Sequence, residues 1–193
     1  MGTYPFGDEK YALVEFARPS FREGQGLSHL GASLITGKQD NEQVIAHEMA
    51  HQWFGNSLTV KRWEDIWLNE SLSEYMAWQW IRESQGEAAY RVLLDSAVTA
   101  TAPAPIVPAN PADLGTLFGS ATFQRGPGVL VLLEQAMGAK VFAMALRSYV
   151  SEHTYGWVET ADFQRSCERA SGRSLDSFFA QWVGGMNRLP PLH

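Results

Sequence analysis

Two histidines one helical turn apart are the residues of this sequence with the clearest capacity for chemistry. The run His47-Glu48-Met49-Ala50-His51 lies in a segment of helical character, and positions i and i+4 of a helix share one face. Two imidazoles placed in this way can bind one Zn²⁺ ion, which prefers four ligands in a tetrahedron. Glu48 points beside the metal, where it can act as the catalytic base for an attacking water.

A third protein ligand for the metal is predicted downstream. Zinc sites of the thermolysin type take two histidines and one glutamate. Glu70 follows His51 after a gap of eighteen residues, which accommodates a turn and a second helix packed on the first. Three other carboxylates, Glu64, Asp65 and Glu74, compete with it, and periodicity alone does not choose among the four.

The elements that must position these residues are predicted as a few strands followed by helices. Residues 11–18 and 33–36 have the composition and alternation of strands. A loop with four prolines is predicted over residues 102–115. Predicted helix N-caps are Asp40 (with Gln43 completing a capping box), Thr160 and Ser174. Helices are predicted over residues 40–54, 69–86, 87–100, 128–137, 139–151, 160–171 and 175–183.

This order of elements predicts an α+β fold in which helices dominate. We expect one domain over residues 1–193, with a small strand-rich part at 1–39 and a helical part at 40–193.

Composition argues against several other classes of protein. The chain has 193 residues and a net charge of −6, and it lacks the clustered cations that nucleic-acid binding requires. The single cysteine, Cys167, excludes an internal disulfide framework and a Cys-rich zinc site. No stretch approaches the ~20 apolar residues of a membrane span and no signal peptide is visible, so we expect no membrane association and a cytoplasmic location.

The stretch HEMAHQWFGNSLTVKRWEDIWLNES, which begins at His47, resembles the signature of the aminopeptidase N family of zinc metallopeptidases. Members usually carry a His-Glu-Leu-Ala-His-Gln-Trp-Phe-Gly-Asn run and, further along, a Trp-Leu-Asn-Glu-Gly run. The resemblance implies that Glu70 is the third ligand beside His47 and His51. It also implies a thermolysin-like zinc peptidase domain that acts on peptides.

The resemblance covers nearly the whole chain. Tyr4-Pro5-Phe6 resembles the opening of the family's catalytic domain, and residues 178–182 resemble its closing helix. In the family a β-sandwich domain usually precedes the catalytic domain. The resemblance therefore implies contact with an N-terminal β-sandwich domain that this sequence does not contain.

The first departure from the family pattern concerns substrate binding. The family usually carries a Gly-x-Met-Glu-Asn motif whose glutamate binds the free amino terminus of the substrate. The corresponding stretch here is Gly26–Gly31, which contains no carboxylate. Ser28 or His29 takes the relevant place, and neither a hydroxyl nor a neutral imidazole gives an ammonium group the same charge pairing.

The second departure concerns the oxyanion of the reaction. The family usually places a tyrosine hydroxyl there, in a Tyr-x-Lys-Gly run, whereas the matching run here begins with Phe123. Losing one such donor typically costs about 10²–10³ in turnover. Arg125 and the tyrosines of the chain are candidate substitutes. Phe123 itself is expected either to face the substrate or to belong to the core.

Three functional hypotheses follow. The first is zinc-dependent hydrolysis of peptide bonds that removes N-terminal residues. The second keeps the chemistry but changes the substrate, because the usual glutamate is missing: the protein is then an endopeptidase, or an exopeptidase that reads the amine by other groups. The third is a zinc-bearing binding module with weakened catalysis, which the phenylalanine at 123 favours and the intact Glu48 opposes.

Overall fold

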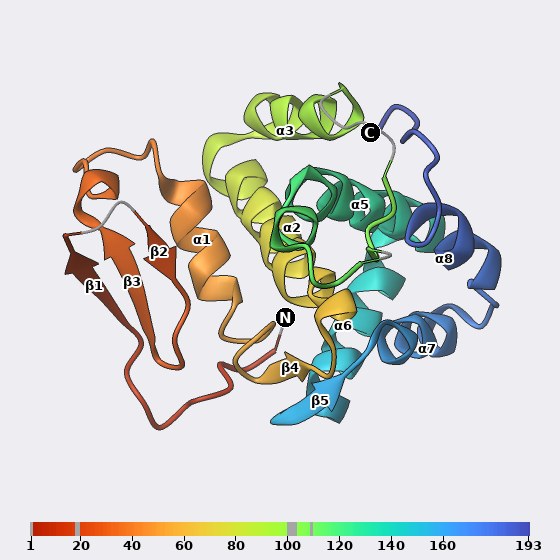
Figure 1. The fold of residues 1–193 in the computed structure, drawn as a ribbon, viewed down its shortest axis with the longest axis horizontal. Helices are drawn as coiled ribbons and strands as arrows, with labels where there is room; N and C mark the ends of the chain where they lie inside the picture. The colour runs from red at the N-terminus through yellow and green to blue at the C-terminus, as the bar shows by residue number, and fades with distance from the viewer. Residues whose placement is uncertain (1, 18–19, 100–103, 109) are drawn as a thin grey trace.

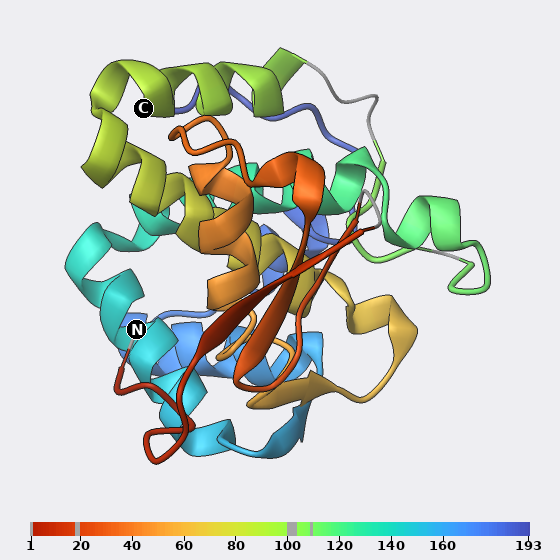
Figure 2. The ribbon, with the colours of Figure 1, turned by 90° about the vertical axis from the view of Figure 1, so that its left-hand side faces the viewer.

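The computed structural model of the protein describes residues 2–17, 20–99, 104–108 and 110–193. Three strands form one side of the molecule and a group of helices forms the other, with helix α1 (Glu42–Ala50) between them (Figure 1). Turned by 90°, the molecule shows the strands crossing in front of α1 (Figure 2). The arrangement confirms the α+β class and the order of strands before helices.

The sheet beside α1 is built around its last strand in the sequence. Strand β3 (Leu27–Gly31) lies in the centre, parallel to β1 (Ala12–Phe16) and antiparallel to the short β2 (Phe21–Arg22). Alternate β3 side chains, Ser28 and Leu30, are buried, as expected for a strand with one face packed on a helix.

The predicted strand at 33–36 was wrong. Residues Ala32–Leu34 form a short 3₁₀ turn (η1), and the strand runs over the preceding five residues instead. Gly24 and Gly26 form the turn before β3, where Gly26 adopts φ 69°, a conformation that favours glycine.

The start of α1 also differs from the prediction. Asn41 occupies the N-cap position and makes no side-chain cap bond. The Asp40 carboxylate instead accepts a hydrogen bond from Thr36 Oγ1 at 2.5 Å, and the Gln43 amide donates to Glu74. The predicted capping box is therefore absent because both of its side chains have other partners.

The helices after α1 follow the predicted order. Helix α2 begins two residues earlier than expected and α5 begins at Gly126, directly after the π-helical turn η3 (Ala121–Arg125). Helix α2 spans Trp67–Gln85 and α5 spans Gly126–Met137. The other helices are α3 (Glu87–Thr99), α4 (Leu114–Leu117), α6 (Ala139–His153), α7 (Thr160–Ser171) and α8 (Asp176–Trp182).

The sequence missed several small elements, among them α4, which takes the last two residues of the predicted loop over 102–115, and it misplaced two caps. Strands β4 (Leu58–Val60) and β5 (Gly156–Val158) form a parallel pair, and Trp63–Asp65 forms a 3₁₀ turn (η2). The N-caps of α7 and α8 are Glu159 and Leu175 rather than the predicted Thr160 and Ser174. Residues 104–108 and 110–113 of the predicted loop are not helical, and its positions 102, 103 and 109 lie outside the described residues.

The hydrophobic core lies among α2, α3, α5, α6 and α7. Its fully buried members include Leu72, Leu94, Phe142 and Phe163. Cys167 is buried in this core, and burial raises the pKa of its thiol to about 12. Within the described residues no single helix has the length and apolarity to cross a membrane, although the bent pair Leu114–Met137 and Ala139–His153 meets that criterion when taken together.

Candidate metal centre

Three side chains converge on one point: His47 of α1, His51 at the C-cap of that helix, and Glu70 of α2. His47 Nε2 lies 2.9 Å from His51 Nε2, and Glu70 Oε2 lies 3.4 Å from the first and 3.5 Å from the second. All three residues are buried. Zn–N and Zn–O bonds of about 2.0–2.1 Å in a tetrahedron separate neighbouring ligands by about 3.4 Å. The three atoms therefore fit a zinc ion, and the fourth corner is left for water or substrate.

The structure chooses Glu70 among the competing carboxylates. The Asp65 carboxylate accepts hydrogen bonds from the backbone and side chain of Thr160, at 2.9 and 2.7 Å. Glu74 reaches the far nitrogen of His47 rather than the metal side of that ring. Within the described residues, the ligand cluster contains Glu70 but does not contain Glu64, Asp65 or Glu74.

The first ligand, His47, is oriented by a network of buried polar groups. Its Nδ1 lies 2.8 Å from Glu74 Oε2. The other oxygen of Glu74 accepts hydrogen bonds from Gln43 Nε2 at 2.5 Å and Trp78 Nε1 at 2.8 Å. A carboxylate at Nδ1 fixes the ring tautomer and directs Nε2 at the metal.

The second ligand, His51, is fixed by other partners. Its Nδ1 lies 2.9 Å from the carbonyl oxygen of Phe54 and 3.1 Å from Ser73 Oγ. The backbone carbonyl accepts the ring proton and again leaves Nε2 free. Each histidine therefore has its outer nitrogen occupied by a protein group.

The ionisation of the metal-free site follows from this packing. Burial lowers the pKa of His47, but hydrogen bonds and charges from Glu70 and Glu74 outweigh burial and raise it to about 10. Burial likewise raises the pKa of Glu70, but His47 and His51 outweigh it and hold that pKa at about 2. Without a metal, His47 is therefore a cation between the carboxylates of Glu70 and Glu74. A bound metal ion would supply the positive charge beside Glu70 in its place.

Glu48 lies on α1 beside this cluster and differs from its neighbours. The residue is 1% exposed, and its Oε2 has no hydrogen-bond partner within the described part of the chain. Burial raises the pKa of its carboxyl to about 7, while the positive charges of His51 and His47 oppose the shift. A carboxyl group of that pKa is suited to accept and return a proton near neutral pH.

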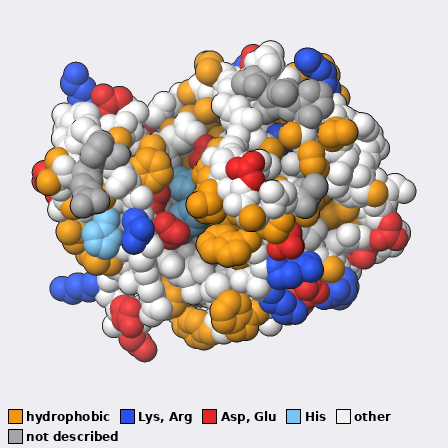
Figure 3. All heavy atoms as spheres, viewed as in Figure 1, with side chains coloured by type: hydrophobic (Ala, Val, Ile, Leu, Met, Phe, Trp, Pro, Cys, Tyr) orange, Lys and Arg blue, Asp and Glu red, His pale blue; other side chains and the backbone are white. Residues whose placement is uncertain are grey.

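Two cavities each have one metal ligand in their lining. The first, which we call the Glu70 cleft, has a volume of about 410 Å³ and is lined by Glu23, Lys61, Arg62, Trp63, Asn69 and Glu70, among others. The second, which we call the His47 pocket, has about 190 Å³ and is lined by Phe21, Gln43, Val44, His47, Glu74 and Phe123. Figure 3 shows the molecule hollowed between the strands and the helices, with a histidine side chain inside the hollow and an acidic side chain at its mouth.

The two candidates for substrate binding on β3 face different directions. The Ser28 hydroxyl accepts a hydrogen bond from Tyr11 at 2.9 Å and lies 3.5 Å from the carbonyl oxygen of Glu48. This contact links β3 to α1. His29 alternates with it along the strand and stacks edge-on against Phe16 of β1. Neither side chain lines the Glu70 cleft or the His47 pocket. The structure therefore gives no support to the prediction that Ser28 or His29 contacts the substrate.

Phe123 lies where the sequence suggested, beside the metal ligands. Its ring centroid is 6.0 Å from that of His47, and it lines the His47 pocket. It is carried by the π-helical turn η3, a feature frequent at functional sites. Ser71, the residue after the third ligand, donates a hydrogen bond to the carbonyl oxygen of Thr122 at 2.7 Å and so fastens this turn to α2.

The side chains suggested as substitutes for the missing tyrosine lie elsewhere. Arg125 is buried and donates to the carbonyl oxygens of Asn187 at 2.5 Å and Trp182 at 3.0 Å, so it ties η3 to the C-terminal segment. The protein has six tyrosines, and none of them lines either cavity at the metal centre.

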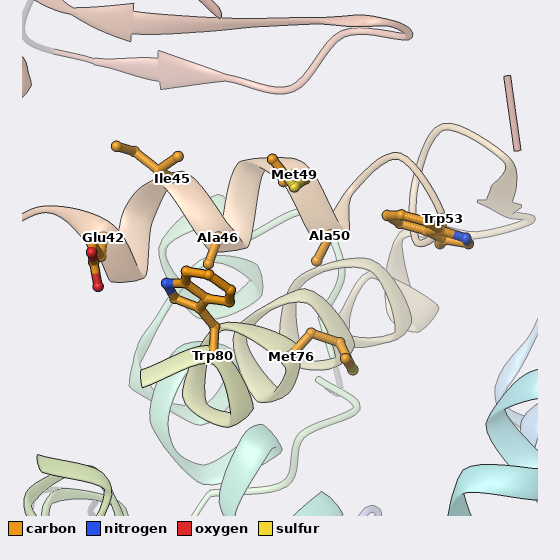
Figure 4. Close-up of a pocket in the computed structure, with 8 residues that line it drawn as sticks. All are labelled: Glu42, Ile45, Ala46, Met49, Ala50, Trp53, Met76 and Trp80. Atoms are coloured by element: carbon orange, nitrogen blue, oxygen red, sulfur yellow. The ribbon is translucent and has the colours of Figure 1, made fainter. Parts of the chain in front are cut away.

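A separate apolar groove runs along another face of α1, toward α2. It has a volume of about 440 Å³, and Ile45, Met49, Trp53, Met76 and Trp80 are among the side chains that line it (Figure 4). Met49 and Trp80 are 43% and 49% exposed. No metal ligand lines this groove, so it is not part of the site where the chemistry takes place.

Sequence reasoning missed one residue that positions the site. Gln52 follows His51 directly and is completely buried. Its side chain binds the backbone of the turn before β3, on the opposite side of the cleft. Its place in the run that resembles the family signature was the available signal, but that run does not reveal its partners.

Comparison with known proteins agrees with this geometry. Residues 21–182 match the family model described as the Peptidase family M1 domain. A probable aminopeptidase 1 of Saccharolobus solfataricus is 30% identical over 182 residues, which cover 89% of this chain and 23% of that protein. Aminopeptidase M1 of Arabidopsis thaliana is 28% identical, covering 91% and 20%.

A solved structure shows the same fold with a ligand. A variant of an M1 zinc metallopeptidase from Deinococcus radiodurans, bound to a Tyr-Ser-Ala substrate, superposes with a TM-score of 0.80 and 26% identity. The match covers 95% of this chain and 41% of that structure. This chain thus spans less than a quarter of the length of these two curated relatives. On the family match and the zinc-site geometry together, the chain belongs to peptidase family M1, a family of zinc metallopeptidases.

Proposed function

We propose that this chain hydrolyses peptide bonds with the help of one zinc ion and removes residues from the amino termini of peptides. The observation that carries the proposal is the buried cluster of His47, His51 and Glu70 with the unpartnered carboxylate of Glu48 beside it. The named relatives are aminopeptidases, and the related structure holds a tripeptide.

The three ligands would hold the ion, which supplies a Lewis acid for the scissile carbonyl and activates the attacking water. Glu48 takes the proton of that water and later gives it to the leaving amine. Its pKa of about 7 suits both steps, because the carboxylate and the acid are both accessible near neutral pH. Glu74 and the Phe54 carbonyl keep the two imidazoles in the required tautomers.

The two cavities suit a peptide that crosses the ligands. Each cavity has one of the metal ligands in its wall, Glu70 in the first and His47 in the second, and the atoms Glu70 Oε2 and His47 Nε2 are 3.4 Å apart. One residue of the substrate then enters each cavity. The aromatic rings of Phe21 and Phe123 favour an apolar side chain in the His47 pocket.

The experiment compares a peptide with a free amino terminus and the same peptide N-acetylated. Each is incubated with the zinc-loaded protein and followed by mass spectrometry, with a chelator and then added zinc as controls. We expect the first residue to be released from the free peptide only, with loss on chelation and recovery on zinc addition. Cleavage of both peptides would instead make the protein an endopeptidase.

A second candidate is a zinc-bearing binding module with weakened catalysis. The observation in its favour is Phe123, which faces His47 without a hydroxyl group. No zinc-dependent cleavage of either peptide, together with retained peptide binding, would support it against the first proposal.

We also propose contact with an N-terminal β-sandwich domain of the kind that the family resemblance implied. The relatives are about four to five times as long as the region they share with this chain, since that region is 23% of one and 20% of another. Adding such a domain as a separate protein and measuring complex formation by analytical ultracentrifugation tests this contact.

A further inference from the structure

The turn before β3 is fastened by one buried side chain to the residues that directly follow α1. Gln52 accepts a hydrogen bond from the backbone N–H of Gly26 at 2.8 Å and donates one to the carbonyl oxygen of Gly24 at 2.9 Å. Because Gln52 follows the ligand His51 in the chain, the position of this turn is fixed relative to the metal centre. The residue that enters the turn is therefore also placed relative to the metal.

That residue is Glu23, and it lines the same cleft as the ligand Glu70. Its side chain is exposed, and within the described residues it forms no ion pair or hydrogen bond. The two cations of the cleft have other carboxylates nearby: Lys61 Nζ lies 3.8 Å from Glu159, and Arg62 Nε lies 3.6 Å from Asp65. Glu23 is thus a carboxylate without a protein partner in the active-site cleft.

Two carboxylates line the Glu70 cleft, Glu23 and Glu70. Glu70 is engaged with the two histidines. A cationic group of a substrate that enters the Glu70 cleft therefore has Glu23 as its available counter-charge.

We propose that Glu23 binds the ammonium group of the substrate's free amino terminus and so determines that this chain acts on N-terminal residues. This inference rests on the proposed peptidase function and names the group that selects its substrate. It assigns to the turn before β3 the role that the family resemblance gave to a glutamate within residues 26–31, where this chain has none. The aromatic side chains of Trp63 and Phe118 line the same cleft and offer the first residue an apolar wall.

The expected effect follows from the strength of a charge-assisted hydrogen bond at an exposed position. Replacing the carboxylate by an amide of the same shape removes the charge and keeps the volume. We expect affinity for a free-amine peptide to fall about tenfold, with no change for the acetylated peptide.

The test measures binding rather than turnover. Glu48→Gln protein, loaded with zinc, is titrated with Ala-Ala-Ala and with N-acetyl-Ala-Ala-Ala by isothermal titration calorimetry, with and without Glu23→Gln. The matched control is Glu15→Gln, an exposed position on β1 that does not line the cleft. Circular dichroism and zinc content establish that each variant is folded and loaded.

Support requires that the parent prefers the free peptide, that Glu23→Gln abolishes this preference, and that Glu15→Gln keeps it. Equal binding of the two peptides to the parent, including no binding to either, would overturn the inference, as would an unchanged preference in Glu23→Gln. Failure of the peptidase proposal is seen separately, as an absence of zinc-dependent cleavage by the protein with Glu48 intact. Because the binding test uses a variant that need not cleave, either proposal can fail while the other stands.

Discussion

The two walls of the active-site cleft are built in opposite ways. The helical wall, formed by α1 and α2, holds the metal ligands in a buried network in which the outer nitrogen of each histidine has a partner. The strand wall, formed by β2, β3 and the turn between them, has its exposed side chains on β2 and the turn, and Gln52 fastens this turn to the residues that follow α1.

The walls differ because one binds the metal and the other is proposed to bind the substrate. A metal needs ligands held within a few tenths of an ångström, and buried hydrogen bonds supply that precision. Substrate recognition tolerates an exposed carboxylate on a turn, because the ligand itself completes the interaction. The helical wall resembles the family signature, whereas the departure at residues 26–31 lies on the strand wall.

The largest expected effect tests the helical wall at Glu48. Glu48→Gln removes the proton acceptor and keeps the shape, so turnover of a free-amine peptide should fall about 10²–10⁴-fold. Zinc content, measured by atomic absorption, should stay unchanged because Glu48 is not a ligand. Glu83→Gln at the exposed end of α2 is the control, and retention of full activity by Glu48→Gln would exclude Glu48 as the base.

The next effect concerns the group that orients the first ligand. Glu74→Ala leaves Nδ1 of His47 without its carboxylate, and we expect zinc affinity to fall about 10–100-fold. Competition with a fluorescent chelator measures the change. Glu64→Ala removes a nearby carboxylate that is not in the ligand cluster, and an equal loss in both variants would show a general effect of charge rather than ligand orientation.

A gain of function is expected at the border of the two walls. Phe123→Tyr adds a hydroxyl group beside His47, and we expect turnover to rise about tenfold, a part of the 10²–10³ that one oxyanion donor contributes. Phe178→Tyr on α8, away from the cleft, is the matched control. An unchanged or lower kcat in the first variant would mean that the ring at position 123 does not face the oxyanion.

The smallest effect is the release of a proton when zinc binds. Without metal, His47 is protonated near neutral pH because its pKa is about 10, whereas Glu70, with a pKa of about 2, is already ionised. Zinc requires a neutral imidazole nitrogen, so binding should release about one proton from this residue. Calorimetry in two buffers of different ionisation enthalpy counts it, and Glu48→Gln protein removes the contribution of that carboxyl. Binding heats that do not depend on the buffer would contradict the ion-pair arrangement of the metal-free site.

The sequence by itself determined the metal centre and the class of fold. His47 and His51 are separated by one helical turn, so local geometry alone brings them together. The order of strands before helices followed from periodicities of two and 3.6, which depend on neighbours in the chain. Between Glu70 and its competitors, the residues alone left the choice open, and the resemblance supplied it.

Only the tertiary structure decided which distant groups complete the site. The partners of His47 at Glu74, of His51 at the Phe54 carbonyl and of Gln52 across the cleft depend on how elements pack. The strand expected at 33–36 was wrong for the same reason, since burial against α1 selected residues 27–31 instead. The sequence did not indicate a role for Glu23, because an exposed carboxylate before a glycine turn is common. Only the packing of the turn shows that Glu23 lines the cleft beside Glu70.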